Sequence, residues 1–254
     1  MAKKIITDDS SFTSLRESDA VYVDKTSHIA RFMDLGKYIF LSRPRRFGKS
    51  LLVSTLEALF LGKRDLFAGL AIEEGWNWQE YPVLRFDFTR ISSDNAVELN
   101  QSLQIILDNF AEKYGITLAP SGLALRFGLL VEKIFTKTGK KVVILVDEYD
   151  KPINEHLDNL EIAEANRTVL GNFYGSLKGS GDHLKLLFIT GVSKFAKVSI
   201  FSKLNNVKDL TLNPDYNDIC GFTQAELEAN FPENIEAAAQ KLGMTYDALL
   251  RELK

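Results

Sequence analysis

The segment Gly48-Lys49-Ser50 matches the second half of the phosphate-loop pattern G-x-x-x-x-G-K-[ST]. In this pattern the N–H groups at a helix start point at phosphates, and the helix dipole favours their charge. Gly48 allows close approach, Lys49 brings a cation to the β- and γ-phosphates, and Ser50 offers a hydroxyl to Mg²⁺. Arg43 stands where the pattern has its first glycine, so it must adopt a compatible backbone angle or the loop must begin differently. The expected nucleotide-binding residues are Arg46, Phe47, Gly48, Lys49, Ser50 and Leu51. On the motif alone, a solvated basic turn is the alternative.

An acidic pair, Asp147 and Glu148, ends the apolar run 142–146. A carboxylate at the tip of a buried strand can hold Mg²⁺, here Asp147 together with Ser50. A neighbouring glutamate can orient or deprotonate a water molecule, which is general-base chemistry. The alternative is an ordinary strand end whose acids cap a helix. The expected catalytic residues are Glu148 from this pair, Lys49 from the phosphate loop, and Thr190, which ends another apolar run.

Thr190 ends a further apolar run, 184–190. Its hydroxyl could sense a γ-phosphate or align water, and a strand-to-loop transition explains it equally well. The same two interpretations apply to other residues near strand ends: Ser193, Lys194, Asp87 and Thr89. Arg45 and Arg46 could neutralise phosphates or act on a neighbouring subunit's nucleotide. Solvation or pairing with nearby acids is the commoner role of such arginines.

The elements that must position these residues alternate between strand and helix. Strands are expected at residues 38–41, 83–88, 142–146, 184–190 and, shorter, 207–212. Helical spacing occurs at residues 29–35, 51–63, 99–114, 121–138 and in a stretch that reaches about residue 178. This alternation predicts an α/β fold of the P-loop NTPase kind, with a mainly parallel five-stranded sheet and helices on both faces. Ligands of such sheets bind at the carboxyl ends of the strands, where every candidate residue falls.

The two ends of the chain are patterned differently. The first 20 residues are polar and weakly patterned. Thr223 and Glu226 have capping-box spacing, and one or two polar helices should follow them. We therefore expect an ATPase-like domain over residues 1–215 and the start of an incomplete helical lid or subdomain over residues 216–254.

Composition narrows the class of protein. The chain has 254 residues, 45% of them hydrophobic, and a formal net charge of −3, which argues against a generally basic nucleic-acid-binding surface. A local basic stretch, 185–208, keeps nucleic acid open as a partner. The single cysteine, Cys220, excludes an intramolecular disulfide, and no long apolar run or signal-peptide core occurs. These features predict a soluble cytoplasmic protein that does not contact a membrane. The three histidines lack metal-ligand spacing.

Several segments closely resemble a bacterial family known as predicted AAA-ATPase, or AAA-ATPase-like, domains. They are YVDKT (22–26), FLSRPRRFGKS (40–50), ILVDEYDKP (144–152), FITGVSKFAKVSIFSKLNN (188–206) and CGFT (220–223). The resemblance covers roughly residues 12–230 and implies an AAA+-like P-loop ATPase core. It implies that residues 48–50 form the phosphate loop (Walker A), that Asp147 and Glu148 form the acidic strand end (Walker B), and that TGVSKF is the sensor region. The family itself has RPRRFGKS, so the resemblance also accounts for Arg43. Many members continue into a PD-(D/E)XK nuclease-like domain, which is not expected within this chain.

Three functions fit these features. The leading hypothesis is Mg²⁺-dependent ATP binding and hydrolysis that gates or drives an effector domain, a partner or a homo-oligomer. The alternative is a nucleotide-dependent switch or scaffold without turnover, against which Glu148 speaks. A small-molecule kinase is the third, but no acceptor-binding segment is evident. The choice between ATP and GTP stays open.

Overall fold

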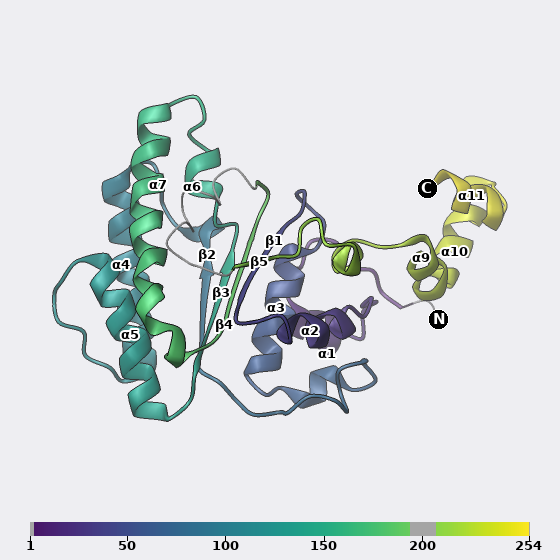
Figure 1. The fold of residues 1–254 in the computed structure, drawn as a ribbon. Helices are drawn as coiled ribbons and strands as arrows, with labels where there is room; N and C mark the ends of the chain where they lie inside the picture. Colours follow the sequence, from purple (N-terminus) through teal and green to yellow (C-terminus); the bar gives the residue numbers. More distant parts are fainter. Residues whose placement is uncertain (1–2, 194–206, 254) are drawn as a thin grey trace.

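A computed structural model describes residues 3–193 and 207–253 of the chain. Its centre is a five-stranded sheet in the order β2-β3-β4-β1-β5, with every pairing parallel (Figure 1). The strands are β1 (Tyr38–Ser42), β2 (Val83–Asp87), β3 (Val142–Asp147), β4 (Leu184–Gly191) and β5 (Lys208–Asp209). The predicted α/β fold with a five-stranded parallel sheet is therefore confirmed.

The central strands are buried on both faces, which explains their continuous apolar sequences. All six residues of β3 are buried, as are seven of the eight in β4. Successive side chains alternate between two cores, so Ile144 packs in one and Leu145 in the other.

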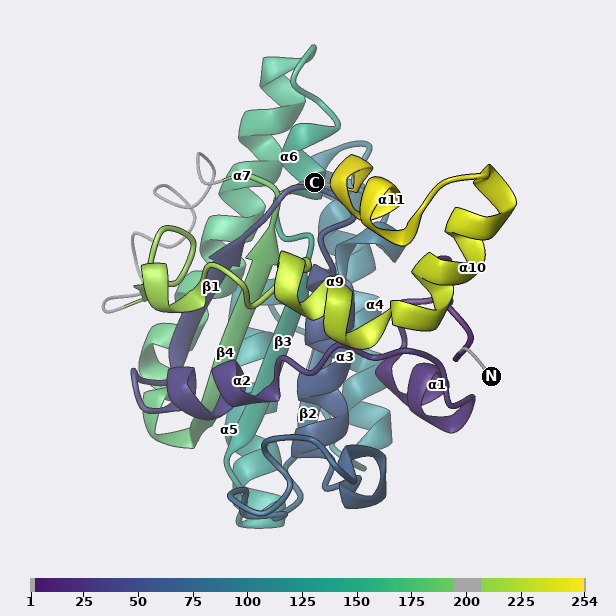
Figure 2. The ribbon, with the colours of Figure 1, turned by 90° about the vertical axis from the view of Figure 1, so that its right-hand side faces the viewer.

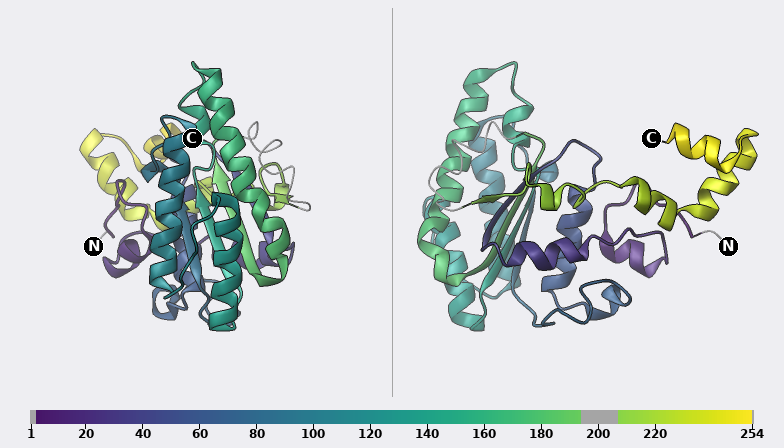
Figure 3. Two further views of the ribbon diagram at one scale, coloured as in Figure 1. Left: turned by 90° about the vertical axis from the view of Figure 1, so that its left-hand side faces the viewer. Right: turned by 45° about the vertical axis from the view of Figure 1, so that its right-hand side comes forward.

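Helices cover both faces, as expected, and the left panel of Figure 3 shows those of the first. The first face carries α4 (Ala96–Lys113), α5 (Leu123–Thr138), α6 (Lys151–Asn154), α7 (Leu160–Gly175) and the 3₁₀ segments η2 (Phe88–Arg90) and η3 (Ser176–His183). The rings of Phe127 and Phe173 stack at 4.2 Å in its core. The opposite face carries α1 (Phe12–Glu17), α2 (Thr26–Met33), α3 (Lys49–Phe60) and η1 (Arg64–Phe67).

Local hydrogen bonds move several element ends away from the predicted ones. Asn95 accepts from the N–H groups of Val97 and Glu98, so α4 begins earlier than the predicted residue 99. The expected strand 207–212 pairs only as Lys208–Asp209, because Asp209 turns the chain by accepting from the N–H of Thr211.

After β5 the chain crosses the carboxyl edge of the sheet and ends in small helices (Figure 2). These are η4 (Pro214–Tyr216), α9 (Gln224–Asn230), α10 (Pro232–Leu242) and α11 (Tyr246–Glu252). The predicted capping box of Thr223 and Glu226 starts α9. The last three helices form a small core of their own that stands off from the sheet beside the N-terminal end (Figure 3, right). The predicted domain division at residue 215 stays a prediction.

Candidate functional site

The strand register brings the predicted site residues to one edge of the sheet. Thr190 pairs with Leu41, one residue before β1 ends at Ser42 and the 43–48 loop begins. Residue 189 of the same strand pairs with Val146, directly before Asp147. The 43–48 loop, the acidic pair and Thr190 therefore come from three adjacent strand ends, where parallel sheets bind ligands.

The 43–48 loop departs from the glycine pattern where it begins. The N–H of Arg43 donates to the carbonyl of Gly191 at 3.2 Å, so this residue prolongs the β1–β4 ladder. The left-handed turns occur later, at Arg46 (φ 65°) and Gly48 (φ 88°). A Cβ at Gly48 would meet nothing within 4 Å, so its backbone angle rather than space favours glycine there. Of the two possibilities for Arg43, the loop indeed begins differently.

The start of α3 has the features of an anion site. No acceptor in the described part of the chain receives a hydrogen bond from the N–H groups of residues 48–51. Lys49 is only 4% exposed, and its Nζ donates to the carbonyl of Pro44 at 3.0 Å across the loop. A phosphate group would bring these donors together with the helix dipole.

Asp147 and Thr190 form one buried unit. The Thr190 hydroxyl donates to Asp147 Oδ1 at 2.7 Å, and both side chains are almost fully buried. This contact favours a role of Thr190 through Asp147 over direct contact with a phosphate.

Glu148 is half-buried beside the phosphate loop and has a left-handed backbone, with φ 53°. Burial, followed by the charge of Asp147, raises the pKa of its carboxyl above the usual value. Lys49 and Arg45 lower that pKa, which shows that the carboxyl lies within electrostatic reach of the loop. A carboxylate with a raised pKa near bound phosphates suits proton transfer.

Asp150 is a buried residue to which sequence reasoning gave no role. It is 1% exposed and accepts from the N–H groups of Val192 at 3.1 Å and Ser193 at 2.6 Å. The amide of Asn154 donates to the same carboxylate at 2.9 Å. The closely spaced acids of DEYD were a sign of its importance, but two of its partners are backbone N–H groups that follow β4, far along the chain.

The segment after β5 is bonded to the phosphate loop. The Arg43 guanidinium donates to the carbonyls of Thr211 and Tyr216, each at 2.8 Å. The N–H of Gly221 donates to the carbonyl of Phe47 at 2.9 Å, while the Phe47 ring is 45% exposed. A ligand bound in the loop would therefore contact a segment that is also hydrogen-bonded to the chain leading to α9.

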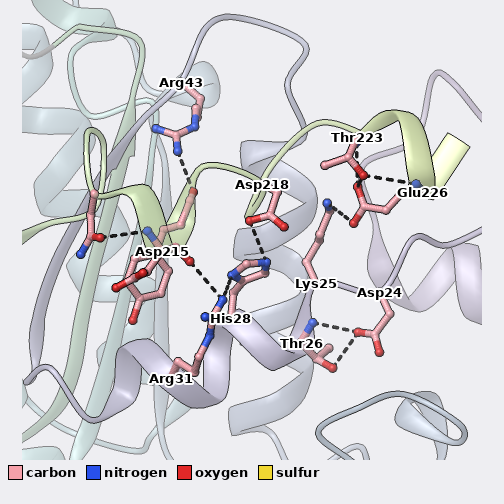
Figure 4. A network of polar contacts seen from close by, with 12 residues as sticks. Asp24, Lys25, Thr26, His28, Arg31, Arg43, Asp215, Asp218, Thr223 and Glu226 are labelled. Atoms are coloured by element: carbon pink, nitrogen blue, oxygen red, sulfur yellow. Dashed lines mark hydrogen bonds and ion pairs between the residues drawn. The ribbon is translucent and has the colours of Figure 1, made fainter.

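A second set of polar contacts joins this segment to α2 (Figure 4). Lys25 Nζ lies 2.5 Å from Glu226 Oε1, and the Lys25 side chain is buried. His28 Nε2 lies 3.2 Å from Asp218 Oδ1, while Arg31 Nη2 lies 2.6 Å from His28 Nδ1. A neutral His28 with its proton on Nε2 satisfies both contacts, and burial lowers its pKa accordingly.

Other candidates are occupied elsewhere or lie outside the described residues. Asp87 pairs in register with Asp147, but its carboxylate accepts from the Thr89 hydroxyl at 2.6 Å and caps the turn after β2. Arg45 and Arg46 are exposed, and Leu51 packs against the core on the face of the sheet that carries α1, α2 and α3. Burial raises the pKa of the Cys220 thiol to about 11. Lys194 and most of the basic 185–208 stretch lie outside the described residues.

The donor set at this edge fits Mg²⁺. The Ser50 hydroxyl and the Asp147 carboxylate are hard oxygen ligands, which Mg²⁺ prefers. Within residues 3–193 and 207–253, no group of three or more His, Cys, Asp or Glu side chains could hold a metal by itself. A magnesium ion here would need phosphate oxygens and water as well, as is usual for Mg²⁺ bound with a nucleotide.

A cavity of about 670 Å³ lies at the opposite edge of the sheet, where the strands begin. Four lysines and Tyr81 contribute to its lining: Lys37, Lys140, Lys141 and Lys185. The cavity is remote from the strand ends that carry the candidate residues, so it does not mark the candidate site. No helix among the described residues is long and apolar enough to cross a membrane.

Comparisons with known proteins agree with the α/β fold. A family model described as Predicted AAA-ATPase matches residues 8–201. An uncharacterized protein from the vnfD 5′ region of Azotobacter chroococcum mcd 1 is 40% identical over 222 residues, which cover 87% of this chain and 43% of that protein. The chain thus spans less than half of this relative's length. No solved structure gives a significant match.

Proposed function

Since the chain belongs to the predicted AAA-ATPase family, we propose that it binds ATP with Mg²⁺ and hydrolyses it at the edge formed by the 43–50 loop, Asp147 and Glu148. The proposal rests on the observation that two groups of residues, one suited to phosphates and one to a metal ion and water, lie at the same edge of the sheet. The N–H groups of residues 48–51, which bond to no acceptor among the described residues, and buried Lys49 suit phosphates, while Asp147 at the end of β3 and Glu148 directly after it lie at the same edge.

Each residue has a role that follows from its position. The N–H groups of residues 48–51 and Lys49 bind the β- and γ-phosphates, with Arg46, Phe47 and Leu51 shaping the loop. Ser50 and Asp147 would hold Mg²⁺, which supplies charge neutralisation at the phosphates when bound. Thr190 fixes Asp147 through its hydroxyl. Glu148 accepts the proton of the attacking water and holds that water in line.

Catalysis of this kind depends mainly on positioning and charge, because phosphoryl transfer needs little covalent help from the protein. Burial and the charge of Asp147 raise the pKa of Glu148, against the charges of Lys49 and Arg45, and a carboxylate with a raised pKa is the better proton acceptor. A nucleotide-dependent switch without turnover is the second candidate, favoured by the Arg43 and Gly221 contacts that join the loop to the chain leading to α9.

Phosphate release by the purified protein tests the proposal. Wild type should hydrolyse ATP only with Mg²⁺, Lys49→Ala should lose nucleotide binding, and Glu148→Gln should bind ATP while its turnover falls to a slow but measurable residual rate. Folded wild type that binds ATP yet releases no more phosphate than Lys49→Ala would support the switch instead. The comparison should be repeated with GTP to settle base preference.

The wider role is also a proposal. The matched relative is more than twice as long as the aligned segment, which is compatible with an effector domain driven by nucleotide turnover. A homo-oligomer would let Arg45 or Arg46 reach a neighbouring nucleotide. Nucleic acid stays open as a partner, tested by salt-dependent binding. We place the protein in the cytoplasm, where nucleotide is supplied and the single free cysteine stays reduced.

A further inference from the structure

We propose that Asp150 is a positioning residue for Glu148. We also propose that position 191 requires glycine, because a side chain there would collide with Tyr149 and Asp150. This inference rests on the proposed function, in which Glu148 acts on water. In this inference Asp150 and Gly191 contribute to turnover by fixing the position of Glu148, and neither residue contacts the nucleotide.

The conformation of Glu148 needs external support. Its φ of 53° lies in the left-handed region, which non-glycine residues adopt at a cost of about 1 kcal/mol or more. Such a residue persists only where its surroundings fix it. The side chain of Glu148 itself is only half-buried, so the anchors are sought in the backbone around it.

Anchors on both sides of Glu148 come from Thr190. Before it, Asp147 accepts from the Thr190 hydroxyl at 2.7 Å. After it, the N–H of Tyr149 donates to the Thr190 carbonyl at 3.0 Å. The residues on either side of Glu148, one through its side chain and one through its backbone, are therefore both bonded to one residue of β4.

Asp150 provides the third anchor. Its buried carboxylate accepts from the N–H groups of Val192 and Ser193, just past the end of β4. Hydrogen bonds to an ionised acceptor are about twice as strong as neutral ones, and here they are shielded from water. Both bonds fall on Asp150 Oδ2, so the residue can act on Glu148 through the backbone, in addition to the direct effect of its charge, which raises the pKa of the Glu148 carboxyl.

Gly191 makes this arrangement possible. A Cβ at this position would lie 2.5 Å from Asp150 Oδ1 and 2.5 Å from the Tyr149 ring. Real Cβ atoms do not approach other atoms so closely, and the buried Tyr149 ring has no room to retreat. Any larger residue would push the turn that carries Glu148 away from β4.

Turnover and nucleotide affinity of Asp150→Ala and Gly191→Ala test the inference, with Asp158→Ala and Gly179→Ala as matched controls. Asp158 is exposed in the same region, and a Cβ at Gly179 meets nothing within 4 Å. We expect kcat to fall about 10- to 100-fold in both test variants, with ATP affinity within about threefold of wild type. Asp150→Asn should restore part of kcat because its amide oxygen can still accept from Ser193. The controls should match wild type.

The Glu148→Gln background separates positioning from general damage. There Asp150→Ala should cause no further loss, because the group it positions is already gone. A folded Asp150→Ala protein with wild-type kcat, or an equal further loss in the Glu148→Gln background, overturns the inference. If wild type itself shows no turnover, the proposed function fails. The inference is then decided by a crystal structure of Asp150→Ala, in which an unchanged left-handed Glu148 refutes it and an altered backbone there supports it.

Discussion

The Thr190 hydroxyl donates a 2.7 Å hydrogen bond to Asp147 Oδ1 where two adjacent parallel strands end. Sequence alone gave these residues separate roles, one as a sensor and one as a metal ligand. Their contact makes them one unit, in which the threonine fixes the direction of the carboxylate that would hold Mg²⁺. Buried groups of this kind are costly to separate, because each loses its partner away from water.

Thr190→Val tests this unit directly, because valine keeps the shape and removes the hydroxyl. We expect the Mg²⁺ concentration for half-maximal turnover to rise several-fold and unfolding free energy to fall by about 1–3 kcal/mol. Both follow from an Asp147 carboxylate that has lost its donor. Turnover against Mg²⁺ concentration and urea denaturation measure the two effects. Thr190→Ser should stay near wild type, and a Thr190→Val protein with unchanged Mg²⁺ dependence would contradict the assignment.

Glu148→Gln should change how stability depends on pH. Burial and the charge of Asp147 raise the pKa of Glu148, against smaller effects of Lys49 and Arg45. A raised folded-state pKa gives stability that is present below the unfolded pKa and is lost as pH rises through the folded value. The glutamine variant lacks this loss, so it should exceed wild type in stability at neutral pH.

Urea unfolding at a series of pH values measures the difference. It should shrink as pH falls and vanish below the ordinary pKa of glutamate. Equal stability of the two proteins at every pH would show that Glu148 titrates normally.

Strands and the two groups of site residues could be predicted from sequence because local pattern determines them. The run 142–146 is uniformly apolar and ends in acid, so both its burial and its chemistry are visible in one segment. Helix α1 was missed because the first 20 residues are mostly polar. Phe12 is nevertheless fully buried, in contact with Tyr22 and Phe67, and such contacts across the sequence leave no local periodicity.

The support of the site could not be predicted because it depends on backbone groups. Asp150 binds N–H groups that lie 42 and 43 residues away, and every amino acid except proline offers the same N–H. Arg43 likewise binds carbonyls of the segment after β5. Side-chain type shows that an acid or an arginine is present, but only the fold shows which backbone groups it meets.

Arg43→Gly would restore the full G-x-x-x-x-G-K-[ST] pattern, yet we expect it to destabilise the protein. The variant loses the guanidinium bonds to Thr211 and Tyr216 and gains backbone freedom. The unfolding free energy should fall by about 2 kcal/mol. Arg43→Lys should lose less than Arg43→Gly, since a point charge can reach one carbonyl but not two. Thermal unfolding ranks the three proteins, and a glycine variant as stable as wild type would show that these bonds contribute nothing.

Lys25→Met should loosen α9 while leaving the sheet intact. Lys25 and Glu226 meet at 2.5 Å in a largely buried position, and they join residues 201 apart. Burial alone would raise the pKa of Glu226, but hydrogen bonds from Lys25 and Thr223 outweigh it and lower that pKa. Loss of the cation should cost about 1–2 kcal/mol, because the pair is only partly exposed. That cost corresponds to roughly 5- to 30-fold faster amide exchange in α9.

Hydrogen exchange resolved by segment measures this effect, because α9–α11 have a core of their own and can loosen separately. Glu226→Gln separates the ion pair from the helix cap, since glutamine can still bind the N–H of Thr223 in the capping box. It should therefore accelerate exchange in α9 through loss of the ion pair, with the first turn of the helix preserved. Thr223→Ala should instead affect that first turn, where it removes the cap. If Lys25→Met leaves exchange in α9 unchanged, the ion pair does not stabilise the position of this helix. The bonds of Arg43 and Gly221 would then join the segment after β5 to the 43–48 loop without help from Lys25.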